Sequence, residues 1–240
     1  MVAVSDLPIL SIQSLLSFQR VAVIAPHPDD ETLGCGGAIA LLRQHHISVE
    51  VLVISDGTGS HPNSKTFPPQ KLRELREQEA RLALSRLGVA ADCITFFRWR
   101  DTAVPHPGDR DFAKAVENCN RVLQRYQPEL IFLPWQRDRH CDHQAAWQIV
   151  QSCLKSWTHR PRQLVYSIWG SAEAGLTVLP EGEKGWRLDI RSVRSLKRDA
   201  AMMHRSQTTA LIQDDPDGFR LTAQMLNNLI QPYEVYLEVS

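Results

Sequence analysis

Short apolar runs alternate with longer amphipathic segments along this chain, and each pattern predicts a different element. An almost wholly apolar run bounded by turn residues is typical of a buried strand. Such runs predict strands at 21–25, 49–54, 94–97, 130–133, 163–168, 186–190 and 233–237. Apolar positions at helical spacing predict helices at 33–45, 70–87, 111–126, 143–157, 192–204 and 217–230.

Strands that alternate with helices form βαβ units and a mostly parallel sheet. The sequence therefore predicts an α/β fold: a Rossmann-like, doubly wound, mostly parallel sheet with helices on both faces. Because no linker, repeat or low-complexity stretch interrupts the pattern, we expect a single domain over residues 1–240. In it, residues 1–19 form an N-terminal extension, and residues 205–240 add a helix and a strand that pack on the rest. The loop 56–69 is long and polar, and we expect it to contact a substrate.

The composition narrows the class of protein. The 27 Lys and Arg residues equal the 27 Asp and Glu residues, and this zero net charge disfavours a dedicated nucleic-acid binder. Five cysteines, an odd number without a Cys-x-x-Cys pair, are typical of reduced thiols and favour a cytoplasmic protein. No apolar run is long enough for a membrane span, and the N-terminus does not resemble a secretory signal.

The loop after the first predicted strand carries candidate chemistry, because it reads Ala25-Pro-His-Pro-Asp-Asp-Glu31. Such an acidic turn does not suit a dinucleotide, whose pyrophosphate needs glycine and free backbone N–H groups. His27 and Asp30 are three residues apart, so one turn of chain directs both at one cation. Alternatively, the three carboxylates simply stabilise a helix N-terminus.

The loop after the fourth predicted strand reads Pro134-Trp-Gln-Arg-Asp-Arg-His-Cys-Asp-His143. Taken alone, Asp142 is explained as a helix N-cap and the histidines as surface residues. In a sheet of strand order 3-2-1-4-5, however, strands one and four are neighbours, and ligands bind beyond their carboxyl ends. The two loops together predict that His27, Asp30 and one later histidine hold a metal. Two imidazoles and a carboxylate suit Zn²⁺ with one position open to water.

Two motifs resemble a known family. Pro26-His-Pro-Asp-Asp-Glu-Thr-Leu-Gly34, followed by Asp138-Arg-His-Cys-Asp-His143, is similar to the LmbE-like/PIG-L family of zinc-dependent N-acetylglucosaminyl deacetylases and related amidases. The similarity includes Arg76-x-x-Glu79 ahead of Leu87-Gly88, Asp101 after the third strand, and Lys197 followed by His204-x-Ser-Gln207. The sequence departs from the family at Cys141, where many relatives have proline, and at Asp138, where some have a carbonyl-polarising tyrosine.

This resemblance implies a role for each matching residue. His27, Asp30 and His143 would hold Zn²⁺, and Asp29 would be the general base. His140 would be the electrophile or general acid, oriented by Asp142, which would favour its imidazolium form. Arg76 and Asp101 would bind sugar hydroxyls.

The predicted helix 70–87 supports part of this assignment independently. Arg76 and Glu79 fall within its apolar arc, and charges that face inward need a partner. One explanation is a buried Arg76–Glu79 pair, and the other is that Arg76 reaches a substrate. His204 ends a predicted helix, where a histidine commonly has a structural role.

The sequence thus predicts a zinc-dependent hydrolase that removes an N-acyl group, with acetyl expected, from an amino sugar or sugar conjugate. One alternative is a metal-dependent hydrolase of a non-sugar amide or ester. The alternative from another class is a non-catalytic nucleotide- or sugar-binding module. The expected partner is a small N-acylated sugar or conjugate rather than nucleic acid, and a homo-oligomer is left open.

Overall fold

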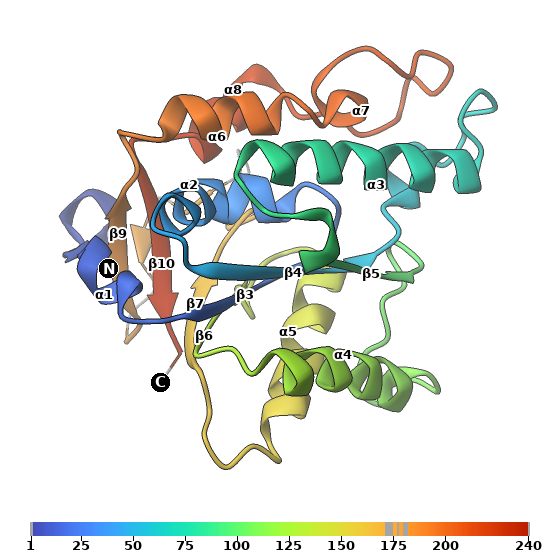
Figure 1. Cartoon of the computed structure of the whole chain (residues 1–240). Coiled ribbons are helices and arrows are strands. Elements are labelled where there is room, and N and C mark those ends of the chain that lie inside the picture. The colour runs from blue at the N-terminus through green and yellow to red at the C-terminus, as the bar shows by residue number, and fades with distance from the viewer. Residues whose placement is uncertain (1, 171–174, 177, 180–181, 240) are drawn as a thin grey trace.

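The computed structural model describes residues 2–170, 175–176, 178–179 and 182–239. At its centre lies an eight-stranded sheet in the order β2-β9-β10-β7-β6-β3-β4-β5 (Figure 1). Its strands are β2 (Ile9–Leu10), β3 (Arg20–Ala25), β4 (Ser48–Ser55), β5 (Ile94–Trp99), β6 (Leu130–Pro134), β7 (Arg162–Tyr166), β9 (Lys184–Asp189) and β10 (Tyr233–Glu238). A separate antiparallel pair joins β1 (Val2–Ala3) to β8 (Val178–Leu179).

The predicted α/β fold and strand order are confirmed. The five strands β5, β4, β3, β6 and β7 are parallel and adjacent in that order, which is the expected 3-2-1-4-5 arrangement. The C-terminal strand β10 lies antiparallel between β7 and β9, and β2 from the N-terminal segment pairs parallel with β9. The strand order therefore reverses between β3 and β6, where an open sheet leaves a crevice for ligands.

Helices cover both faces of the sheet (Figure 1). On one face lie α2 (Asp30–Gln44), α3 (Pro69–Arg86), α6 (Arg194–Ala201) and α8 (Ala223–Leu229). On the other face lie α4 (Phe112–Tyr126) and α5 (Cys141–Leu154). The remaining helical segments are α1 (Ile12–Leu16), α7 (Arg205–Thr208) and the 3₁₀ turns η1 (Val4–Asp6), η2 (Thr58–Ser60) and η3 (Ala91–Cys93).

The helix predicted at 217–230 forms only over Ala223–Leu229. Thr222 caps it, because its Oγ1 accepts the N–H of Met225 at 3.1 Å. The residues before the cap bond elsewhere: the N–H of Phe219 donates to the Ser60 carbonyl at 2.7 Å. Together with the bond from the N–H of Leu221 to the Gln207 carbonyl at 2.8 Å, this tertiary bond holds the segment before Thr222 as a loop.

Alternating residues of the central strands separate the two cores. Val21 and Val23 of β3 face the layer that contains α2, whereas Ala22 and Ile24 face α4 and α5. Helix α2 packs very close to the sheet, because a Cβ on Gly34 would collide with the Tyr166 ring. This close packing fixes the N-terminus of α2 beside the carboxyl end of β3.

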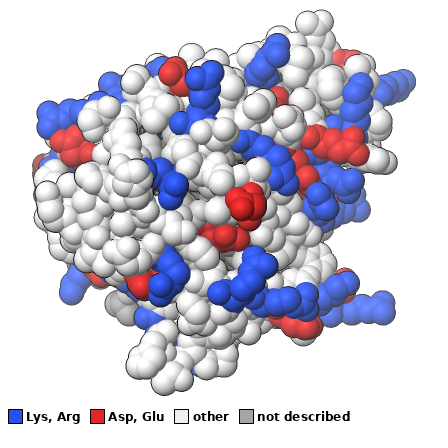
Figure 2. Space-filling model, viewed as in Figure 1, with Lys and Arg blue, Asp and Glu red and all other residues white. Residues whose placement is uncertain are grey.

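No helix in the described part of the chain is long and apolar enough to cross a membrane. On the face shown in Figure 2, Lys and Arg side chains are interspersed with Asp and Glu side chains.

Candidate active site

The candidate site lies where β3 and β6 end side by side. His27 follows β3, and Asp30 is the first residue of α2. His140 and His143 lie at the start of α5, after β6. The parallel β3–β6 pair thus brings the two motifs together although more than a hundred residues separate them in the sequence.

The side chains of His27, Asp30 and His143, the expected ligand set, converge at this edge of the sheet. Oδ2 of Asp30 lies 3.1 Å from Nδ1 of His27 and 3.2 Å from Nε2 of His143. All three side chains are buried, and neither ring nitrogen of His143 completes a hydrogen bond among the described residues. A buried nitrogen without a partner is costly unless it is a ligand. The donor set of two imidazoles and one carboxylate therefore fits a metal ion.

Nitrogen atoms of His27, His140 and His143 also lie within 4.8 Å of one another, so a third imidazole borders the ligand set. Burial of His140 and the neighbouring His27 and His143 lower its pKa, which favours the neutral ring. This differs from the expected imidazolium. In the neutral ring Nδ1 accepts the backbone N–H of Asp142 at 3.2 Å, so the proton is on Nε2.

Among the described contacts, Asp142 hydrogen-bonds His140 through its backbone N–H, while its carboxylate binds other groups. That carboxylate accepts the N–H groups of Thr102 at 2.7 Å and Val104 at 3.2 Å, and it lies 3.2 Å from Nε2 of His27. The Asp142 carboxylate is held by the turn after β5, which supplies the N–H groups of Thr102 and Val104. At the start of α5, only the backbone N–H of Asp142 bonds His140.

Asp29 lies beside the ligand set and pairs with Arg76. The guanidinium donates to Oδ2 of Asp29 at 3.0 Å and to the carbonyls of Pro28 at 3.1 Å and Gly57 at 2.8 Å. Burial raises the pKa of Asp29 to about 6, although the positive charge of Arg76 opposes the increase. Of the two explanations for Arg76, the Arg76–Glu79 pair is not formed.

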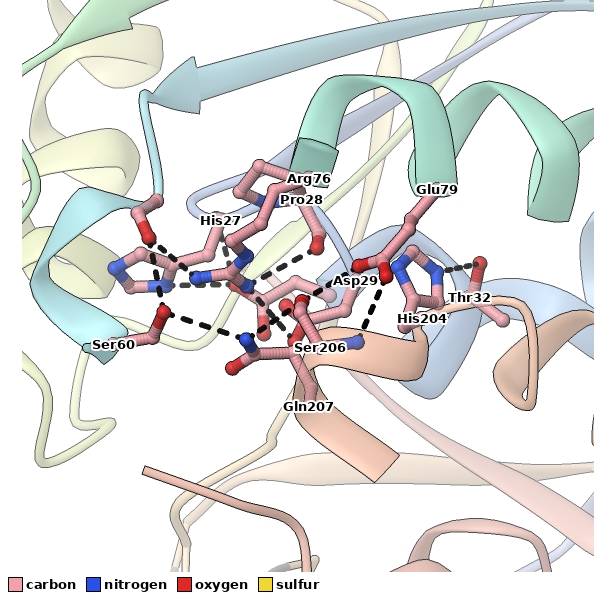
Figure 3. A network of polar contacts seen from close by, with 12 residues as sticks. His27, Pro28, Asp29, Thr32, Ser60, Arg76, Glu79, His204, Ser206 and Gln207 are labelled. Carbon is pink, nitrogen blue, oxygen red and sulfur yellow. Dashed lines mark hydrogen bonds and ion pairs between the residues drawn. The ribbon is translucent and has the colours of Figure 1, made fainter. Parts of the chain in front are cut away.

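Glu79 instead binds the His204-x-Ser-Gln207 motif, in the network shown in Figure 3. Its carboxylate accepts the N–H of Ser206 at 2.8 Å and the hydroxyl of Ser206 at 2.6 Å. The Gln207 amide N–H donates to Oγ of Ser206 at 2.9 Å and to Oγ of Ser60 at 3.3 Å. The buried His204 ring lies 3.3 Å from Oγ1 of Thr32. Through these bonds, the motif connects α7 to α3 and to the loop after β4.

A cavity of about 180 Å³ opens at this site. Its polar side includes His27, Asp29, Asp30, Arg76, Asp101 and His140. Its apolar side consists of Leu33, Trp169, Phe219 and Leu221. Gly59 and Ser60, from the loop 56–69, also line the cavity.

Sequence reasoning missed two features of this site. Trp169 and Phe219 form an edge-to-face pair with ring centroids 5.6 Å apart, although no local pattern distinguishes them from core aromatics. Asp138 was noted only as a departure from the family, yet its Oδ2 lies 3.3 Å from Nδ1 of His143. The spacing of Asp138 and His143 in one motif was the available signal.

Comparison with known proteins gives relatives over most of the chain. The family model "GlcNAc-PI de-N-acetylase" (PIG-L) matches residues 22–154. A "Probable N-acetyl-alpha-D-glucosaminyl L-malate deacetylase 2" of Bacillus subtilis is 30% identical over 82% of this chain and 86% of the relative. A "1D-myo-inositol 2-acetamido-2-deoxy-alpha-D-glucopyranoside deacetylase" of Corynebacterium diphtheriae is 25% identical, over 85% of this chain and 73% of the relative.

Among solved structures, N,N'-diacetylchitobiose deacetylase from Pyrococcus horikoshii shares the fold, with a TM-score of 0.66 and 21% identity. The match covers 82% of this chain and 73% of that chain. The matched family region contains both motifs of the site, from His27 to His143. The chain therefore belongs to the PIG-L (GlcNAc-PI de-N-acetylase) family, and the prediction of a deacetylase, a hydrolase of amide bonds, is confirmed.

Proposed function

We propose that this protein is a Zn²⁺-dependent deacetylase that hydrolyses the N-acetyl group of an amino sugar conjugate. The observation that carries the proposal is the placement of one oxygen of Asp30 between Nδ1 of His27 and Nε2 of His143. Two imidazoles and a carboxylate are the protein ligands of many catalytic zinc sites. When bound, Zn²⁺ supplies Lewis acidity, which polarises the amide carbonyl and acidifies water.

Asp29 is the proposed general base. It is adjacent in sequence to the ligand Asp30 but contacts Arg76, so it is available to accept the proton of the attacking water. With a pKa of about 6, raised by burial, its carboxylate is mostly ionised at neutral pH and is more basic than an exposed aspartate. Arg76 fixes the carboxylate through Oδ2 and leaves Oδ1 for the water.

His140 is the proposed donor on the opposite side of the substrate. Because its Nδ1 accepts the N–H of Asp142, the neutral ring presents Nε2–H toward the site. That N–H is placed to stabilise the developing oxyanion or to hydrogen-bond the leaving amine. Asp142 thus acts on His140 through its backbone rather than through its carboxylate.

The two sides of the cavity favour a sugar as substrate. A pyranose combines hydroxyl groups with an apolar ring face, and the cavity combines Arg76 and Asp101 with Trp169 and Phe219. We propose that Arg76 and Asp101 contact hydroxyls and that the aromatic pair contacts the ring face. The relatives named above act on N-acetylglucosamine linked to malate or inositol.

The five cysteines are all unpaired, which supports a cytoplasmic location.

The test combines metal analysis with acetate release. Purified protein is assayed on N-acetylglucosamine conjugates of malate and inositol, on free N-acetylglucosamine and on non-sugar acetamides, with and without a chelator. We expect stoichiometric zinc and chelator-sensitive acetate release from the sugar conjugates. Release from the non-sugar acetamides alone would support the alternative hydrolase instead. Protein without bound metal that hydrolyses none of the panel would contradict the proposal.

A further inference from the structure

The outer nitrogens of His27 and His143 each face buried carboxylates, on the side of the ring away from Asp30. Nε2 of His27 lies 3.2 Å from Oδ1 of Asp101 and 3.2 Å from Oδ2 of Asp142. Nδ1 of His143 lies 3.3 Å from Oδ2 of Asp138. We propose that these three aspartates are positioning residues that fix opposite tautomers, so that His27 binds the metal through Nδ1 and His143 through Nε2.

The position of His143 depends on Asp138. The Asp138 carboxylate is fully buried and accepts the N–H groups of His140 at 3.2 Å, Ile168 at 3.1 Å and Trp169 at 2.9 Å. These bonds anchor the carboxylate between the loop after β6 and the end of β7. Nδ1 of His143 lies 3.3 Å from this fixed anion without completing a hydrogen bond in the described structure. In a neutral His143, a small rotation that turns Nδ1–H to the anion would leave the lone pair of Nε2 facing Asp30.

The position of His27 depends on two carboxylates from different elements. Asp101 belongs to the turn after β5, and its Oδ2 accepts the N–H of Gly59 at 2.9 Å. Asp142 belongs to the first turn of α5 and accepts the N–H groups of Thr102 and Val104. Because backbone donors offset part of each negative charge, both anions can approach the same ring nitrogen.

The opposite tautomer of His27 is disfavoured on electrostatic grounds. With the proton on Nδ1, the lone pair of Nε2 would face Asp101 and Asp142, two anions that need a donor. With the proton on Nε2, both anions receive the same N–H, and the lone pair of Nδ1 points toward Oδ2 of Asp30, where a cation belongs. Asp30 already accepts the backbone N–H of His27 at 2.9 Å, so it has no need of the ring proton.

This inference rests on the proposed metal site and adds a second role to Asp101, which was expected only to bind substrate. Outer partners of metal-binding histidines typically change metal affinity by about 10- to 100-fold when mutated. His143 faces one carboxylate and His27 faces two. We therefore expect Asp138→Asn to weaken Zn²⁺ binding more than Asp101→Asn or Asp142→Asn alone. The double variant Asp101→Asn/Asp142→Asn is expected to approach the effect of Asp138→Asn.

The first experiment measures the dissociation constant of Zn²⁺ by competition with a chromophoric chelator, which needs no substrate. It compares the wild type with the three single variants and the double variant. Asp199→Asn, at an exposed position of α6, is the matched control and is expected to bind like the wild type. Asp142→Asn also disturbs the bonds to Thr102 and Val104, so circular dichroism and thermal unfolding accompany each titration.

The second experiment records long-range ¹⁵N–¹H correlations of histidine side chains in the zinc-loaded wild type, so it does not depend on whether a variant folds. We expect two zinc-bound rings, one coordinated through Nδ1 and one through Nε2. Two rings bound through the same nitrogen, or folded variants with wild-type zinc affinity, would overturn the inference while the proposed function stands. A wild type that binds no zinc would overturn both.

Discussion

Two of the groups of buried charges in the described part of the chain differ in how their charges are balanced. Beneath α2, Nζ of Lys197 lies 2.7 Å from Oε1 of Glu234, and both side chains are almost completely buried. The Glu234 carboxylate also accepts the N–H groups of Gly37 at 2.7 Å and Ala38 at 2.8 Å and the hydroxyl of Tyr236 at 2.7 Å. This pair is balanced in charge, and the Glu234 carboxylate accepts hydrogen bonds at both oxygens.

At the ends of β3 and β6 the balance is different. Five buried aspartates, which surround His27 and His143 or pair with Arg76, are Asp29, Asp30, Asp101, Asp138 and Asp142. The negative charge exceeds what Arg76 and two imidazoles offset, and a cation would complete the cluster. The comparison shows that a buried charge alone does not indicate function. At the ends of β3 and β6, by contrast, the excess of negative charge borders a cavity, and this combination supports a functional site.

Removal of the metal is expected to have the largest effect. Dialysis against a strong chelator should abolish acetate release, and added Zn²⁺ should restore it, because the carbonyl is no longer polarised without the cation. The Lys197–Glu234 pair needs no cation, so far-UV circular dichroism should change little. Acetate release that survives complete removal of zinc would contradict the proposed mechanism.

Asp29→Asn is expected to have the next largest effect, since it removes the proposed base but leaves the proposed ligands His27, Asp30 and His143. Loss of a general base typically lowers kcat by about 10²- to 10⁴-fold. Steady-state kinetics and the zinc titration should show a large loss of kcat with zinc affinity near that of the wild type. If kcat stays normal, Asp29 is not the base.

Lys197→Met tests the other half of the comparison. Removing one member of a buried ion pair leaves an unpaired charge and typically lowers the free energy of unfolding by about 3–5 kcal/mol. Urea unfolding measures this loss, and the zinc affinity of the folded variant should remain unchanged. A variant with the free energy of unfolding of the wild type but a weaker zinc affinity would show that the Lys197–Glu234 pair belongs functionally to the site.

Phe219→Ala is expected to have the smallest effect. The aromatic contact of Phe219 with a sugar ring is worth about 0.5–1.5 kcal/mol, which corresponds to an increase of KM by about 2- to 12-fold. The value of kcat should change little, because the apolar ring of Phe219 carries no group that can transfer a proton. A loss confined to kcat would instead assign this ring to the chemical step.

Much of the fold was predictable because its signals are local. The apolar runs of β3, β4, β5 and β6 and the helical spacing between them predicted both the elements and their parallel order. The prediction was wrong at 217–222, where bonds from a distant loop replaced helical bonds. Intrinsic helix propensity is weak, so tertiary contacts of this kind override it.

The sequence predicted which residues gather at the candidate site, but not which of them contact one another. The motifs around His27 and His143 indicated which side chains gather, since the strand order places both loops at one edge. They did not indicate that Arg76 pairs with Asp29 or that Asp142 faces His27. These contacts depend on loop conformation, which the spacing within one motif does not encode.

The sequence by itself therefore determined the α/β fold, the family and the candidate residues for a metal site. Periodicity and motif spacing are properties of neighbouring residues along the chain, so they can be recognised without a structure. The tertiary structure decided the partner of each buried charge, because Asp101, Asp138 and Asp142 reach their histidines only after separate loops have packed together. It also decided the apolar side of the cavity, where Trp169 and Phe219 meet across fifty residues of chain.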